Sequence, residues 1–115
     1  MNIDKNYLHD FLHDDILNMG FDEETVDVAL DAFIESTEES LPKLVTAIKE
    51  ENMEDIRFHA HTLKGTYANF DNENFKELSE LFKEIEFAAK DKKDMESIKE
   101  YFEKIKNLTL DWLKL

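Results

Sequence analysis

Residues 56–70 read IRFHAHTLKGTYANF, and this stretch decides both the fold class and the candidate site. Its apolar side chains recur at three- or four-residue spacing, at Ile56, Ala60, Leu63, Tyr67 and Phe70. That spacing places them on one face of an α-helix, and we predict a helix over about residues 53–69. The stretch contains no acid, although about one residue in four of the chain is acidic, and it contains the only arginine.

The same apolar spacing continues on both sides of this stretch and predicts four more helices. The first is expected at about residues 4–18 and ends at Gly20, and the second runs from the N-cap Asp22 through Ile48 with a kink near 38–42 caused by Pro42. Another is expected at about 73–91. The last follows a polar connection at 91–93 and runs from the cap Asp94 to Trp112. With only two glycines and one proline, the composition disfavours an all-β fold. We therefore predict an all-α protein: an antiparallel up-down four-helix bundle over residues 21–115, with an additional short N-terminal helix as an accessory segment over 1–20.

Composition narrows the class of function. A chain of 115 residues supports one domain, and the absence of cysteine excludes disulfides, thiolate metal ligands and a cysteine nucleophile. The net charge is −14, and residues 1–55 carry 16 acids against 3 bases. Such a polyanion is a poor partner for nucleic acid or an anionic membrane. Because no apolar run approaches the roughly 18 residues of a membrane span and the N-terminus lacks signal-peptide features, we expect a cytoplasmic protein.

His61 is the residue that the helical geometry turns outward. With the buried stripe centred on Leu63, His61 lies about 160° from its centre, whereas His59 lies only about 40° away and should be partly buried. The residues sharing the outer face with His61 are Arg57, Lys64, Gly65 and Ala68.

Lys64 and Gly65 indicate what the outward imidazole does. Helical side chains lean toward the N-terminus, so Lys64 can bring its ammonium beside His61, and Gly65 leaves the ring uncovered. A glycine inside a helix costs about 1 kcal/mol relative to alanine, which favours access for a bulky partner as its reason. An exposed nucleophilic imidazole beside a cation suits a histidine that carries a phosphoryl group.

The run from Ala60 to Thr66, AHTLKGT, resembles the A-H-x-L-K-G-[ST] signature of histidine-containing phosphotransfer (HPt) domains. Residues 44–48 resemble the family's preceding helix, and residues 85–90 (IEFAAK) are similar to its L-E-x-A-A-[RK] stretch. The resemblance covers about residues 22–113. One departure is Asp71, where the family usually has a glycine at the end of the histidine helix.

The resemblance implies a four-helix bundle whose surface histidine relays phosphate in a multistep two-component system. By the same resemblance, His61 is phosphorylated, Lys64 stabilises the phosphoryl group and Gly65 admits the partner. The implied partners are a response-regulator receiver domain and a histidine kinase or hybrid kinase. The protein would be a phosphocarrier without kinase activity and without a cofactor of its own, because the magnesium belongs to the receiver. We expect a monomer.

Docking residues are less closely defined. Arg57, Phe58 and Ala68 surround His61 on its own helix and are candidates for receiver docking. The fourth helix can be aligned with the family in two registers. The alignment without a gap places Lys83 opposite the histidine, whereas the alignment with three extra loop residues places Glu86 and Lys90 there. Lys83 and Lys90 are therefore both candidates.

Two other interpretations stay open. His9 and His13 are spaced i, i+4 beside Asp10 and Asp14, a spacing compatible with metal binding, but a solvated polar face explains it as well, and we predict no metal site. The other alternative is an interaction module of the same fold that binds a receiver or kinase without being phosphorylated. A kinase of its own is excluded because the chain has no Gly-rich phosphate loop.

Overall fold

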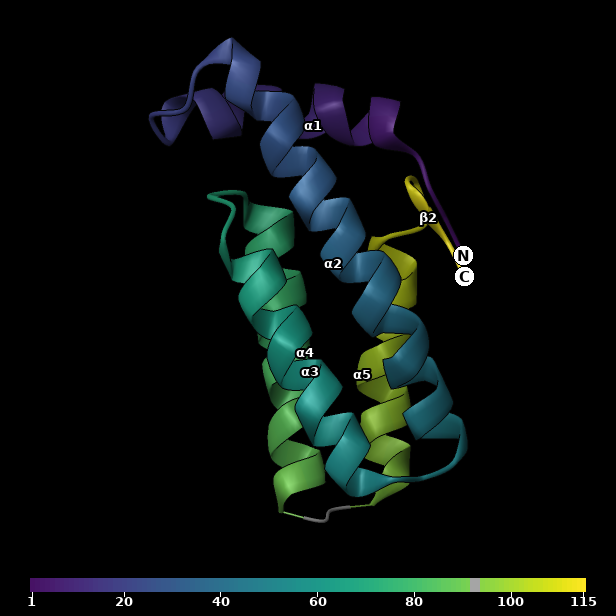
Figure 1. Ribbon diagram of the computed structural model, residues 1–115. Helices are drawn as coiled ribbons and strands as arrows, with labels where there is room; N and C mark the ends of the chain where they lie inside the picture. The colour runs from purple at the N-terminus through teal and green to yellow at the C-terminus, as the bar shows by residue number, and fades with distance from the viewer. Residues whose placement is uncertain (92–93) are drawn as a thin grey trace.

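A computed structural model describes residues 1–91 and 94–115. Within these ranges, five helices follow one another along the chain between two short strands, which pair with each other as a ribbon (Figure 1). The elements are β1 (Asn2–Ile3), α1 (Lys5–Asn18), α2 (Glu23–Lys49), α3 (Met53–Ala68), α4 (Glu73–Lys90), α5 (Met95–Leu108) and β2 (Leu113–Lys114). The prediction of an all-α fold is confirmed, and α2 continues through Pro42 as a single helix.

Helices α2 to α5 form the bundle, and consecutive helices pack against each other while α5 closes back onto α2. The chain runs alternately down and up along the bundle, and α1 lies across one end (Figure 1). Each helix begins at an Asp or Asn side chain that accepts a hydrogen bond from the backbone N–H three residues later. In the part of the chain that the structure describes, no helix combines the length and apolar character needed to cross a membrane.

An aromatic cluster fills the end of the core nearest α1. Phe75 of α4 lies at its centre, with its ring centroid 5.1 Å from that of Phe33 and 5.8 Å from that of Trp112. Tyr67 and Phe70 join it from the end of α3. Burial of large rings contributes strongly to stability, so this cluster holds α2, α3 and α4 in register.

Helix α1 packs as part of the core. The side chains of Leu8, Leu12 and Ile16, spaced at four residues along one face of the helix, are fully buried. Polar contacts add to this packing: the Lys5 ammonium lies 2.8 Å from the Asp31 carboxylate of α2. Gly20, with φ of +100°, adopts the left-handed conformation that reverses the chain between α1 and α2.

The C-terminal segment differs from the prediction. Helix α5 ends at Leu108 and does not reach Trp112. The N–H of Thr109 still donates to the carbonyl of Ile105, and the chain then turns, with the N–H of Trp112 donating to the carbonyl of Thr109. The turn returns Trp112 to the aromatic cluster, where it is 4 % exposed. It also aligns β2 antiparallel to β1, a ribbon that the apolar spacing did not predict.

Two loop features bear on the predictions. Asp71 follows the end of α3, and among the described residues only Gly20 and Glu51 have positive φ, so position 71 does not require a glycine here. The Asp71 carboxylate instead pairs with Lys76 at 2.8 Å. The connection predicted at 91–93 includes Lys92 and Lys93, which lie outside the described residues.

Candidate functional site

His61 stands on the outer face of α3, near the middle of the helix. Its neighbours Ala60 and Leu63 are fully buried against the core, which turns the imidazole outward. The His61 side chain is 65 % exposed, whereas His59 is half-buried beside Phe58. Both placements agree with the helical geometry predicted from the sequence.

A carboxylate from the neighbouring helix holds the imidazole. Nδ1 of His61 lies 2.9 Å from Oε2 of Glu86 on α4, whose side chain is only 13 % exposed. An ionised carboxylate can only accept a hydrogen bond, so Nδ1 carries the proton and donates it to Glu86. The other ring nitrogen, Nε2, makes no hydrogen bond to the described residues.

Lys64 reaches the same carboxylate. Its Nζ lies 3.0 Å from Oε1 of Glu86, so the lysine and the histidine each contact one oxygen. Partial burial by itself would raise the pKa of Glu86, but Lys64 and His61 outweigh it and hold that pKa below its ordinary range. Glu86 is therefore an anion at neutral pH. The Lys64 ammonium, the cation predicted beside the His61 ring, is held there by its ion pair with Glu86.

Gly65 leaves open space above the site. A Cβ added at this position would have no atom within 4 Å apart from its chain neighbours and its own helix backbone. The backbone there does not adopt positive φ. Neither packing nor conformation therefore requires a glycine at position 65.

The contact with Glu86 distinguishes the two registers considered for α4. The Ser79 hydroxyl donates to the carbonyl of Lys64 at 3.0 Å and helps to fix the register of α3 and α4. It is Glu86 that faces His61, whereas the Lys83 ammonium lies 5.7 Å from the ring centroid of Phe87. The ungapped register, with Lys83 opposite the histidine, is therefore wrong.

The remaining predicted residues lie around this centre on different sides. Arg57 and Lys90 line one shallow hollow between α3 and α4. Phe58 is 64 % exposed and lines another hollow, of about 440 Å³, between α2 and α3. Ala68 is exposed near the end of α3. The structure thus joins His61, Lys64 and Glu86 into one contact network and leaves the docking candidates on its margins.

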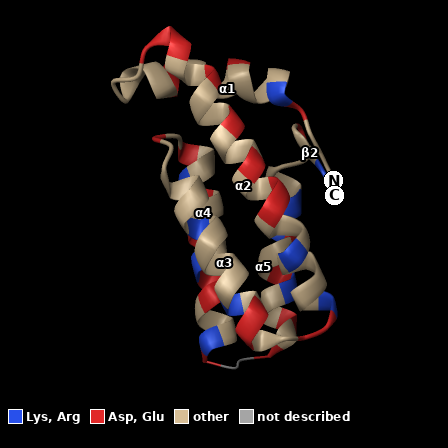
Figure 2. Cartoon of the chain, viewed as in Figure 1, with Lys and Arg blue, Asp and Glu red and all other residues tan. Residues whose placement is uncertain are grey.

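The uneven distribution of acidic residues along the sequence reappears in the fold. Acidic residues occur along the length of α2, whereas the acids of α3 are confined to its first turn, before His61 (Figure 2). The basic residues of α3 are Arg57 and Lys64, which lie within one turn of His61 along the helix. The part of α3 that follows its first turn therefore presents no acidic side chain of its own beside the imidazole.

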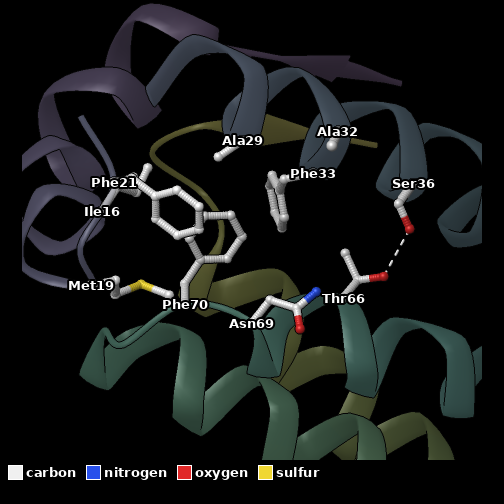
Figure 3. Close-up of a pocket in the computed structure, with 10 residues that line it drawn as sticks. All are labelled: Ile16, Met19, Phe21, Ala29, Ala32, Phe33, Ser36, Thr66, Asn69 and Phe70. Carbon is white, nitrogen blue, oxygen red and sulfur yellow. Dashed lines mark hydrogen bonds between the residues drawn. The ribbon is translucent and has the colours of Figure 1, made fainter. Parts of the chain in front are cut away.

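A separate hollow of about 400 Å³ lies between α1, α2 and the end of α3 (Figure 3). Its rings and aliphatic side chains come from Ile16, Met19, Phe21, Ala29, Ala32, Phe33 and Phe70. Ser36 and Thr66 line its polar side, with their hydroxyl oxygens 2.8 Å apart. None of the residues predicted for the site lines this hollow.

His9 and His13 do not gather a metal site among the described residues. Nε2 of His13 lies 2.8 Å from a Glu23 carboxylate oxygen, and its Nδ1 lies 3.0 Å from Asp14. These hydrogen bonds, first that with Asp14 and then that with Glu23, raise the pKa of His13. His13 thus connects α1 with the start of α2, whereas His9 contacts only Asp10 and the His13 ring of its own helix.

Comparison with known proteins adds a family to this geometry. The family model described as Hpt domain matches residues 28–110, which include all of α3, α4 and α5. No curated protein and no solved structure matches the chain. Since the family model covers well over half of the chain and contains the whole contact network around His61, the protein belongs to the Hpt domain family.

Proposed function

We infer from its membership in the Hpt family that this chain takes part in histidine phosphotransfer in two-component signalling, as a phosphocarrier rather than an enzyme. We propose that His61 is the phosphorylated residue and relays a phosphoryl group from a receiver-domain aspartate, or from a histidine kinase, to a response regulator. One observation carries this assignment: an exposed imidazole whose Nδ1 proton is held by Glu86 and whose Nε2 is free to react.

The transfer follows from the tautomer. The Nε2 lone pair attacks the phosphorus of an aspartyl phosphate, the N–P bond forms, and the P–O bond to the aspartate breaks with release of its carboxylate. The proton on Nδ1 stays in place throughout. Glu86 acts as a positioning residue, because it sets the ring orientation and the tautomer without contacting the phosphoryl group.

Lys64 is proposed to stabilise the phosphoryl oxygens. Its side chain is 29 % exposed and reaches Glu86 from one turn beyond His61, so its ammonium lies at the edge of the reaction space. A cation at this place offsets the charge of the transferring group. We expect the magnesium ion for the reaction on the receiver domain, with no cofactor on this chain.

The direct test is transfer from a partner. The protein is incubated with a receiver domain phosphorylated on its aspartate, and the product is analysed for a label that is acid-labile and base-stable, as a phosphohistidine is. Peptide mapping is expected to place that label on His61. A label on another residue, or no transfer from any receiver of the same organism, would contradict the proposal.

The Lys64→Ala variant is expected to transfer about ten- to a hundredfold more slowly, because the charge beside the phosphoryl oxygens is lost. The rate is measured by rapid-quench kinetics from a phosphorylated receiver, with circular dichroism to show an unchanged fold. Lys64→Arg, which keeps the charge, serves as the matched control and should retain most of the rate. Equal rates in Lys64→Ala and the natural protein would remove Lys64 from the mechanism.

The Gly65→Gln variant is expected to change stability and docking in opposite directions. Glutamine favours helix more than glycine does and meets no neighbour here, so the free energy of unfolding should rise by about 0.5–1 kcal/mol. Its side chain covers the space above His61, so receiver affinity should fall by about tenfold or more. Isothermal titration calorimetry measures this affinity, and the receiver affinity of Gly65→Ala should lie between that of the natural protein and that of Gly65→Gln. Unchanged affinity in Gly65→Gln would show that access does not depend on this position.

A further inference from the structure

Phosphorylation changes the charge of the His61 ring itself. With the proton on Nδ1, attachment of a phosphoryl group to Nε2 gives a ring that is formally an imidazolium. The Glu86 carboxylate, 2.9 Å away on the Nδ1 side, is the only acid that contacts this ring among the described residues. The contact that selects the tautomer before the reaction therefore becomes an ion pair after it.

The protonation of that ring decides how easily the phosphoryl group leaves. From the protonated ring, the N–P bond breaks with its electron pair going to Nε2, and the leaving group is neutral imidazole. From a ring that has lost its Nδ1 proton, the leaving group would be an imidazolide anion, which is a far stronger base and a far poorer leaving group. A group that keeps the proton on Nδ1 thus keeps the phosphoryl group transferable.

We propose that Glu86 maintains the phosphorylated His61 ring in its protonated form and thereby sustains onward transfer to a receiver aspartate at and above neutral pH. The inference rests on the proposed function of His61. It gives Glu86 a role beyond orientation, since an uncharged hydrogen-bond acceptor would orient the ring equally well.

A cation near the ring opposes its protonation. The basic residues of the two helices are Arg57 and Lys64 of α3 and Lys76, Lys83 and Lys90 of α4, of which Lys76 pairs with Asp71 and Lys83 lies over the Phe87 ring. Of these, Lys64 shares the Glu86 carboxylate, at 3.0 Å from Oε1. When its ammonium turns to the phosphoryl oxygens, Glu86 loses this competing partner and its full charge acts on the ring. The short direct contact with Nδ1 makes Glu86 the dominant group.

The test uses chemically phosphorylated protein, so that no receiver is needed. His61 is phosphorylated with phosphoramidate, and the ring protons and nitrogens are followed by NMR from pH 5 to 10 in the natural protein, Glu86→Gln and Glu84→Gln. Glu84 is exposed on the same helix, so its variant reproduces the charge change without the contact. The midpoint of ring titration should fall by about one pH unit in Glu86→Gln and stay unchanged in Glu84→Gln.

The rate of phosphoryl loss is measured on the same samples. Above the titration midpoint, Glu86→Gln should lose its phosphoryl group about tenfold more slowly than the natural protein, whereas at pH 5 the two rates should coincide. A merely orienting residue would not shift this pH profile. Equal midpoints in the natural protein and Glu86→Gln, or equal shifts in both variants, would overturn the inference. Failure of transfer from a receiver, with the titration shift present, would instead count against the proposed function.

Discussion

The His61→Gln variant should take no phosphoryl label from a phosphorylated receiver while keeping its fold. Glutamine keeps a polar side chain at this exposed position but has no ring nitrogen with a nucleophilic lone pair. Because the His61 side chain is 65 % exposed and its neighbours hold the core, the substitution should change the free energy of unfolding by less than about 0.5 kcal/mol. Labelling by transfer and thermal unfolding measure the two properties on the same sample.

His59→Gln is the matched control for this experiment. It removes an imidazole two residues away on the same helix, from a half-buried position that lines two hollows together with residues of α2. We expect its label to equal that of the natural protein. An undiminished label in His61→Gln would refute the assignment, and loss of the label only in His59→Gln would transfer the role to that residue.

The Phe75→Ala variant should lose about 3–5 kcal/mol of unfolding free energy. The Phe75 side chain is fully buried, and its ring centroid lies between 5.1 and 6.4 Å from five others. Those rings belong to Phe11, Phe33, Tyr67, Phe70 and Trp112. Truncation removes the ring at the point where α1, α2, α3, α4 and the C-terminal segment meet, so the cavity cannot close by movement of one helix.

Urea denaturation measures this loss, with Phe58→Ala as the control. Phe58 is 64 % exposed, so its truncation should cost less than about 1 kcal/mol. If Phe75→Ala is too unstable to purify, Phe75→Leu should show a smaller loss in the same direction. A cost in Phe75→Ala no larger than that in Phe58→Ala would show that the cluster does not hold the bundle together.

Much of the architecture was predictable from periodicity and capping. The stripe of Leu8, Leu12 and Ile16 and the caps at Asp22 and Asp94 describe local preferences, which a sequence carries directly. The end of α5 was not predictable in this way. Trp112 continues the apolar spacing of that helix, yet it reaches the core from a turn, because a spacing pattern identifies which side chains are buried and not which backbone carries them.

The candidate site also contains one part that was predictable from the sequence and one part that was not. His61, Lys64 and Gly65 are neighbours on one helical face, so their arrangement follows from 3.6 residues per turn. Glu86 lies 25 residues further along the chain. Its contact depends on the length of the loop between α3 and α4, and alignment with the family allowed either Lys83, or Glu86 with Lys90, to face the histidine.

The amino-acid sequence by itself determined the class of fold, the position of the helices and the outward face of α3 with its histidine, lysine and glycine. These features depend on interactions within a few residues of one another. Only the tertiary structure decided which carboxylate holds the His61 ring, which ring nitrogen that carboxylate contacts and how β1 and β2 pair as a ribbon. The physical reason is that such contacts join distant segments, whose relative placement is set by the packing of the whole core.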